Sequence, residues 1–489
     1  MLHPVLVGIG LALFYGVLLF ANLQRFLDHD QAVYAMNVWS CNGYKGDYFI
    51  NPHHLHFEAG GFWFHTFLNK FPEYFSDNIM FHLRLRSLLF GMIGVFAMYF
   101  YFWLVSRKIF ISVCITLCAA FTHGYLDYSA KNDTGIYPAA WLYVMMIFGY
   151  FIKSTDHKYY ILSMAAGFVF YLGVMAHEYM LFACVSIFFY LLIPSGMSFP
   201  GISSFSVRTE KEKYTPGFIR KTFSLFLIFL FCFIPTAQTY LWGGRIIFKL
   251  EFDNKYYSFQ NWLFGYLLGS PYGKAAAKFN PELSFRGFTD ALFARTDGIN
   301  YNQKLDFLYN FMNAFDPVSF THTAVISIIL LSAAASFFFL PFLLKRFGRE
   351  YILLIMNIIF FIFIGIDIEP YYFEFWIIPA MLAVQMAAFL FIWISEKAES
   401  FEIIKQFRYV LFFPFILFAS LIIQHNYNYE LKLHSRNFLS EAVYGNLPNH
   451  RIEYFRYKYL YKNPEEPYKE IDSNVKTLPS VEDMKVRSN

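Results

Sequence analysis

Charged residues are scarce in this chain, and their scarcity limits the classes of protein to which it can belong. Asp, Glu, Lys and Arg make up only 15% of the 489 residues, whereas 57% are hydrophobic. Soluble domains carry about a quarter charged residues, and a soluble core could not hide this much apolar surface. The net charge of +4 is small for the length and gives no sign of nucleic-acid binding. A Gly-rich phosphate loop of the usual soluble kind is also missing, which argues against a soluble nucleotide enzyme.

Cysteine is rare as well. Cys114, Cys118, Cys184 and Cys232 fall inside apolar stretches, and only Cys41 lies in an expected loop outside the membrane. A cysteine in such a loop cannot pair with one buried in an apolar stretch. We therefore expect no disulfide framework.

Apolar residues are abundant, and they come in blocks of about 18 to 22, the length that crosses a bilayer as a helix. The sequence predicts an all-α polytopic membrane protein of about eleven spans. The expected spans are 4–23, 86–105, 109–123, 136–152, 159–176, 179–194, 222–242, 322–342, 351–366, 375–395 and 409–424. The first block lacks a clear signal-peptidase site and is long enough to remain a span.

Basic residues fall in every second short loop. These loops carry Arg107 and Lys108, Lys153 and Lys158, the stretch 208–221, Lys345 to Arg349, and Lys397 to Arg408. The short loops between them are acidic or carry histidine. The positive-inside rule then places the N-terminus in the cytoplasm and the C-terminus outside.

This orientation divides the chain into a transmembrane domain (1–424) and an extracytoplasmic tail (425–489). Two long outer loops, 24–85 and 243–322, interrupt the transmembrane domain, and their length favours a functional use. We expect the protein to lie in a bacterial inner membrane, with its outer face toward the periplasm or the exterior.

The first outer loop carries the most informative polar residues. Asp28 and Asp30 follow the first span directly, where a carboxylate can act as a general base or two can hold Mg²⁺ or Mn²⁺. His53, His54 and His56 could bind a metal, a phosphate or a sugar hydroxyl. The plain alternatives are a solvated span end and a His-rich turn at the interface. No cofactor is certain, and a divalent metal stays open.

Three further segments place polar residues on the same face. Lys131 could neutralise a phosphate, and Asp133 could bind an acceptor or a metal. His177 and Glu178 interrupt an almost continuous apolar stretch, and Glu374 precedes a late span. Taken singly, each residue also fits a polar turn. Ionisable groups near a membrane interior are costly unless they are paired or serve a site, so the shared face suggests a functional site.

The order of these motifs resembles that of the GT-C class of membrane glycosyltransferases, which includes protein O-mannosyltransferases and aminoarabinose transferases. The similar motifs are Asp28-His-Asp30, Asn51-Pro52-His53-His54, Arg84-Leu-Arg86-Ser87, the segment 128–140 and Glu374-Phe-Trp-Ile-Ile-Pro379. The resemblance covers residues 1–195 and, more loosely, 365–395. The family often has Asp-Glu where this chain has Asp-His-Asp, so either aspartate could be the base.

The resemblance implies a reaction. A sugar would pass from a polyprenyl-phosphate donor in the membrane lipid to a glycan, lipid or protein acceptor, with Asp28 or Asp30 as general base. An Asp-x-Asp metal site, as in oligosaccharyltransferases of the same class, is the alternative role for these two residues. The candidate substrate- and phosphate-binding residues are His53, His54, Arg84, Lys131, Asp133, His177, Glu178, Arg295 and Glu374.

Other functions stay open from the sequence alone. A lipid-linked oligosaccharide polymerase or ligase would suit the second long loop, which carries Arg245, Arg286 and Arg295. A flippase or transporter would normally bind near the midplane and show internal repeats, neither of which the pattern indicates. A metal-dependent hydrolase could use the cluster from His53 to His56.

Overall fold

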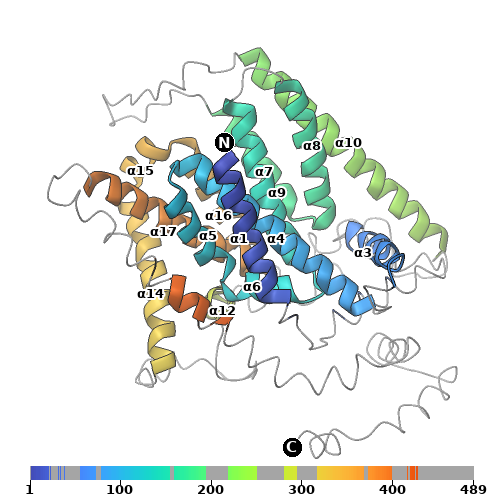
Figure 1. Ribbon diagram of the computed structural model, residues 1–489. Helices are drawn as coiled ribbons and strands as arrows, with labels where there is room; N and C mark the ends of the chain where they lie inside the picture. Colours follow the sequence, from blue (N-terminus) through green and yellow to red (C-terminus); the bar gives the residue numbers. More distant parts are fainter. Residues whose placement is uncertain are drawn as a thin grey trace, which may run out of the picture.

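The architecture comes from a computed structural model, and it is helical throughout the part that can be described (Figure 1). The described residues are 2–20, 55–72, 79–154, 159–193, 218–250, 280–293, 317–367 and 373–398, with scattered positions at 23–38 and 416–427. The helices are α1 (Leu2–Phe20), α3 (Leu55–Leu68), α4 (Ile79–Ser106), α5 (Ile109–Ala120), α6 (His123–Ala130), α7 (Ile136–Ser154), α8 (Tyr159–Ala176), α9 (Met180–Leu192), α10 (Phe218–Leu250), α12 (Pro281–Leu292), α14 (Pro317–Phe338), α15 (Leu340–Phe347), α16 (Arg349–Asp367), the 3₁₀ helix η5 (Phe373–Trp376) and α17 (Ile377–Ala398). None of these ranges contains a strand.

Each expected span in the described part of the chain contains a helix, although the spans 109–123 and 322–342 run past the ends of α5 and α14, where the chain bends. In chain order these helices are α1, α4, α5, α7, α8, α9, α10, α14, α16 and α17, while most of the last expected span, 409–424, lies outside the described residues. Seven helices are long and apolar enough to cross a membrane, or up to nine if each of two bent pairs is one span. The prediction of an all-α polytopic fold is confirmed. The count of eleven and the orientation stay predictions.

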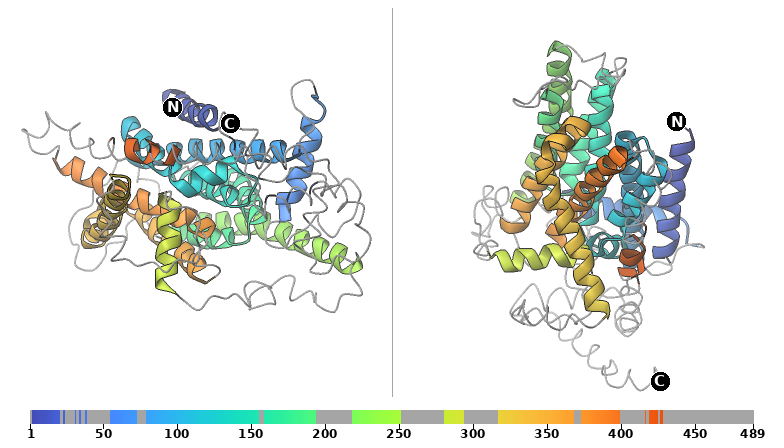
Figure 2. Two further views of the ribbon diagram at one scale, coloured as in Figure 1. Left: turned by 90° about the horizontal axis from the view of Figure 1, so that it is seen from below. Right: turned by 90° about the vertical axis from the view of Figure 1, so that its left-hand side faces the viewer.

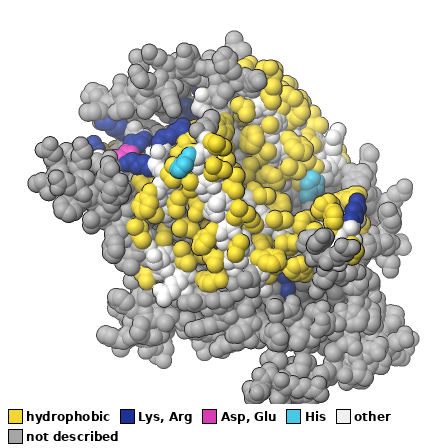
Figure 3. All heavy atoms as spheres, in the orientation of Figure 1, with side chains coloured by type: hydrophobic (Ala, Val, Ile, Leu, Met, Phe, Trp, Pro, Cys, Tyr) yellow, Lys and Arg dark blue, Asp and Glu magenta, His cyan; other side chains and the backbone are white. Residues whose placement is uncertain are grey.

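The centre of the bundle is α17. In its candidate span 83% of the residues are buried, and it packs against α5, α12, α14 and α16. By contrast α1 lies at the surface and exposes Leu6, Leu13 and Val17. Figure 3 shows the broad hydrophobic face that this helix and its neighbours present. Such a face suits contact with lipid rather than water.

The pair α8 and α10 forms one edge of the molecule (Figures 1 and 2). Gly167 of α8 makes their close approach possible, because an added Cβ would lie 2.6 Å from the Cβ of Phe231 and 2.8 Å from the carbonyl oxygen of Ile228. Only 17% of the candidate span of α10 is buried. Most of this helix therefore depends on α8 for its place in the bundle.

The segment after Ile109 differs from the prediction. A single span at 109–123 with a polar outer turn behind it was expected, but α5 ends at Ala120 and α6 leaves it at 70°. The Thr122 hydroxyl donates to the Ala119 carbonyl at 2.8 Å and helps to close α5. Every residue from Phe121 to Ala140 is buried. This segment is buried because α6 packs against η5 and α12, which come from distant parts of the chain.

Asn426 lies in the expected extracytoplasmic tail (425–489), and it packs against the helices. Its side chain is fully buried, and its amide donates to the carbonyls of Phe121 at 2.7 Å and Leu292 at 3.1 Å. These carbonyls follow α5 and end α12, where helices leave acceptors unpaired. Asn426 therefore belongs to the packed domain.

Arg107 and Lys153, which are described residues of two of the basic loops, lie at one end of the bundle, which we call the basic end. There Arg107 donates to the Tyr150 hydroxyl at 2.9 Å, Lys153 donates to the Tyr190 carbonyl at 2.6 Å, and the Tyr190 hydroxyl donates to Glu350 at 3.0 Å. These contacts join α4, α7, α9 and α16. Helix α7 has 19 residues, so its two ends lie about 28 Å apart. The turn that carries Lys131 and Asp133 comes just before α7 and therefore lies at the opposite end of that helix.

Candidate active site

The predicted site residues divide into two groups. Asp28, Asp30, His53, His54 and Arg295 lie outside the described residues. The others are described and come from four separate segments of the chain: Arg84, Lys131, Asp133, His177, Glu178 and Glu374. Their positions show how many of these residues the fold brings into a single site.

Lys131 is the centre of a buried charge cluster. It is 5% exposed, and its amino group lies 3.1 Å from Asp127 and 3.5 Å from Asp133. The same nitrogen sits 3.5 Å from the centre of the Tyr128 ring. Asp127 and Lys131 are brought together by helical spacing, because residues four apart lie on one face of α6. A buried amine between two carboxylates and an aromatic face is held in a single position.

Glu374 joins this cluster from the other half of the chain. Its two carboxylate oxygens accept hydrogen bonds from the Thr134 hydroxyl at 2.7 Å and the Tyr128 hydroxyl at 3.4 Å. Thr134 also donates its backbone N–H to Asp133 at 2.6 Å. The short turn between α6 and α7 therefore connects a carboxylate of its own to one from η5.

The turn between α8 and α9 approaches the same carboxylates. The His177 and Tyr179 rings stack with centroids 3.8 Å apart. The Tyr179 ring also contacts the Phe375 ring of η5, with centroids 6.3 Å apart. Because Phe375 follows Glu374 directly, this contact places the His177 turn beside the cluster. Glu178 lies in the same turn and is half-buried.

Arg84 borders the cluster on the side of α4. Its guanidinium lies 3.5 Å from the side-chain oxygen of Gln31, and the Asn132 amide donates to the Gln31 carbonyl at 3.2 Å. Gln31 follows Asp30 directly in the sequence. Through Gln31, the first outer loop therefore contacts both α4 and the turn at Asn132.

Arg86 was not among the predicted site residues, although it lies in the Arg84-Leu-Arg86-Ser87 motif. It is 5% exposed, donates Nε to the Tyr137 hydroxyl at 2.7 Å and Nη1 to the Phe57 carbonyl at 2.6 Å, and stacks over both rings. Its Nη2 has no hydrogen-bond partner, and no carboxylate pairs with it within the described ranges. A buried cation without a counter-ion is costly, so its retention favours an anionic ligand.

The described carboxylates do not form a metal site among themselves. No group of three or more His, Cys, Asp or Glu side chains in the described ranges is arranged to hold a metal ion. Asp133 and Glu374 instead use oxygens to accept hydrogen bonds from protein donors.

Comparison with known proteins gives a distant likeness in fold. No protein-family model matches the chain, and no curated protein matches it. The apo oligosaccharyltransferase of Archaeoglobus fulgidus is similar, with a TM-score of 0.46 and 14% identity over 93% of this chain and 59% of that one.

Two further structures of the Archaeoglobus fulgidus enzyme are similar to the same degree. The complex of AglB with an inhibitory peptide and a dolichol-phosphate has a TM-score of 0.44 and 14% identity over 92% of this chain. The form tethered to an acceptor peptide has 0.44 and 14% over 97%. This chain spans 59% of the length of each. With TM-scores below 0.5, the likeness says nothing about the chemistry of this chain.

Proposed function

We propose that this chain is a GT-C-type membrane glycosyltransferase that moves a sugar from a polyprenyl-phosphate carrier to a glycan, lipid or protein acceptor outside the cytoplasm. One observation carries the proposal. Segments around Arg84, Lys131, His177 and Glu374 bury ionisable side chains together at one end of a membrane bundle. Ionisable residues at such positions are retained when they serve a substrate or ion site.

Asp28 or Asp30 is the proposed general base. The carboxylate takes the proton of an acceptor hydroxyl or amine, and the freed lone pair attacks the anomeric carbon of the sugar. The bond between that carbon and the phosphate oxygen breaks, and polyprenyl phosphate leaves with the electron pair. Asp30 directly precedes Gln31, which contacts Arg84 and Asn132.

Arg86 is the proposed cation for the leaving phosphate. A guanidinium has five N–H donors, and Arg86 spends two on Tyr137 and Phe57. The remaining donors suit the planar, bidentate recognition of a phosphate, and fixed positive charge stabilises the leaving group as it forms. Lys131 was predicted for this role, but its amine is already shared by Asp127 and Asp133. We infer that Lys131 mainly holds those carboxylates in place.

A divalent metal at Asp28 and Asp30 stays part of the proposal as an alternative to a pure base. Mg²⁺ or Mn²⁺ there would stabilise charge on the departing phosphate. The residues of the described cluster orient the acceptor and exclude water in either case.

The proposal is tested with the purified full-length chain in lipid nanodiscs and a panel of polyprenyl-phosphate sugars. Mass spectrometry of the products should detect covalent sugar transfer, with and without a chelator. Flux of sugar across liposomes without a covalent product would favour a transporter. Transfer of preformed oligosaccharides alone would favour a lipid-linked oligosaccharide ligase.

Arg86→Gln tests the phosphate role, and Arg107→Gln is its matched control. Arg107 also stacks on aromatic rings and donates to a tyrosine hydroxyl, but at the basic end of the bundle. We expect the Arg86 variant to lose at least about tenfold in kcat/KM, because a charged hydrogen bond contributes about 1.5–3 kcal/mol. The control should keep wild-type activity. Equal losses in both variants would show that Arg86 acts only through the fold.

A further inference from the structure

Helix α15 does not continue the span that precedes it. It meets α14 at an angle of 84° and has only eight residues, so it is about 12 Å long and cannot cross a bilayer core of about 30 Å. The chain turns again at Gly348, whose φ of 56° lies in the left-handed region that favours glycine, before α16 begins at Arg349. Helix α15 is therefore a short segment between two sharp turns.

Two contacts place α15 at the basic end of the bundle. Arg346 donates Nη2 to Glu396, near the end of α17, at 2.8 Å, and this ion pair is partly exposed. Glu350, at the start of α16, accepts from the Tyr190 hydroxyl, and the backbone carbonyl of that tyrosine accepts from Lys153. Helix α15 thus lies at the end of the bundle where α7, α9 and α17 finish.

The helix has a buried face and an exposed face. Leu343 and Phe347, four residues apart, are buried where α15 packs on α16 and α17. On the other side Phe342 is 50% exposed, and Lys345 is exposed three residues later. Phe338, at the bend itself, is 85% exposed. Two aromatic rings and a cation, Phe338, Phe342 and Lys345, form an exposed surface that we call the α15 face.

Trp393 of α17 holds the aromatic side of this segment in place. Its ring centroid lies 5.2 Å from that of Phe339 and 5.5 Å from that of Phe342. Phe342 is thus packed on one side and open on the other, so its exposure is built into the fold. Apolar rings held at a surface gain free energy by leaving water, and a group of them marks a contact with protein or membrane.

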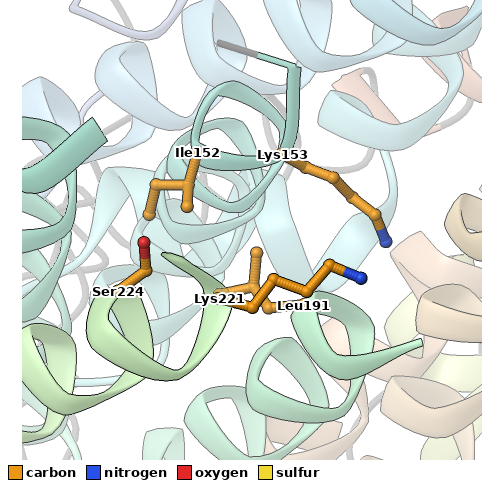
Figure 4. Close-up of a pocket in the computed structure, with 5 residues that line it drawn as sticks. All are labelled: Ile152, Lys153, Leu191, Lys221 and Ser224. Atoms are coloured by element: carbon orange, nitrogen blue, oxygen red, sulfur yellow. The ribbon is translucent and has the colours of Figure 1, made fainter. Parts of the chain in front are cut away.

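Cations of other helices lie at the same end of the bundle and favour membrane over protein as the partner. Lys153 is near the end of α7 and Lys221 near the start of α10, and Figure 4 shows their amino groups extending to the same side. Aromatic rings together with lysine and arginine are typical of the level at which a span leaves the bilayer. The α15 face combines both kinds of side chain at this level.

From these observations we infer that α15 lies in the head-group layer of the bilayer, parallel to the membrane plane. Phe338 and Phe342 lie among the upper parts of the acyl chains, and Lys345 lies beside the lipid phosphates. Amphipathic helices of this kind are buried about 5–10 Å into the boundary between head groups and acyl chains. The exposed pair of Arg346 and Glu396 fits that level, because charges near the bilayer centre are costly. The inference does not depend on the proposed function.

The test measures the depth of nitroxide labels in the full-length chain in lipid nanodiscs. Cys41→Ser removes the cysteine expected in an outer loop, and the four cysteines that the structure describes are buried. In that background Phe338→Cys, Phe342→Cys and Lys345→Cys each carry one label. Relaxation of the label by oxygen, which concentrates among acyl chains, is compared with relaxation by a water-soluble nickel chelate.

Labels at Phe338 and Phe342 should respond more to oxygen, at a depth of about 5–10 Å, and the label at Lys345 should respond more to nickel. Ile359→Cys is the matched control. This residue is 59% exposed and lies about 15 Å along α16 from Arg349, so its label should report a position near the bilayer centre.

Three results would overturn the inference. A Phe338 label as deep as the Ile359 label would indicate a re-entrant loop formed by α14 and α15. Labels at Phe338 and Phe342 that respond mainly to nickel would place the α15 face in water. Labels shielded from both reagents would show that protein, such as a second copy of the chain, covers this face.

Discussion

Replacing Lys131 by methionine should destabilise the protein more than replacing any exposed lysine. The change keeps the length of the side chain but strands Asp127 and Asp133, which lie 3.1 and 3.5 Å from the amine. Removing one partner of a buried ion pair costs about 3–5 kcal/mol. The Thr134 N–H still supports Asp133, so we expect the lower value, about 3 kcal/mol.

Thermal unfolding of the purified chain measures this effect. At about 2–4 °C per kcal/mol for a large domain, the apparent Tm of Lys131→Met should fall by about 6 °C or more. The double variant Asp127→Asn/Lys131→Met should recover part of the loss, because one stranded carboxylate is gone. Lys70→Met, at an exposed position after α3, should change stability by less than about 0.5 kcal/mol. A variant as stable as the wild type, with no benefit from the second substitution, would refute the buried charge cluster.

Three further changes probe other parts of the structure. Burial lowers the pKa of His56 from its ordinary 6.5. The unfolded chain therefore takes up a proton before the folded chain does, and the stability of the fold decreases as the pH drops below about 6.5. His56→Gln should reduce this decrease in unfolding assays run between about pH 7 and pH 5. Gly167→Ala places a Cβ against the Ile228 carbonyl and should lower stability by about 1–3 kcal/mol; an unchanged Tm would refute the close packing of α8 on α10. Asn426→Asp should lower the Tm more than Asn426→Ala, because a carboxylate cannot donate to the two carbonyls and repels them; the reverse order would contradict the described geometry.

The fold was predictable from the sequence where long apolar blocks left one solution. A block of this length in lipid must form a helix, because a helix pairs the backbone N–H and C=O groups of the segment with one another where no water is present. The break between α5 and α6 was not predictable, because the block from Ile109 onward is apolar through Phe121 and gives no local sign of a 70° bend. The cover that α6 receives from α12 and η5 depends on tertiary contacts.

The site was predictable in part. The sequence placed Asp133, His177 and Glu374 on one face, and the structure brings their segments together, although their roles stay predictions. Helical spacing could have revealed the pair of Asp127 and Lys131. Arg86 is of interest because no carboxylate within the described residues pairs with it. A sequence motif cannot show whether a charged side chain has a partner in the fold.

The most direct measurement is sugar transfer by the purified full-length chain from polyprenyl-phosphate sugars, compared among wild type, Asp28→Asn and Asp30→Asn. The proposed function predicts a covalent glycosylated product with the wild type, and loss of at least about a hundredfold in the variant that lacks the general base. Full transfer by both variants would remove these aspartates from the reaction. Failure of every donor in the panel to yield a covalent product would contradict the glycosyltransferase itself.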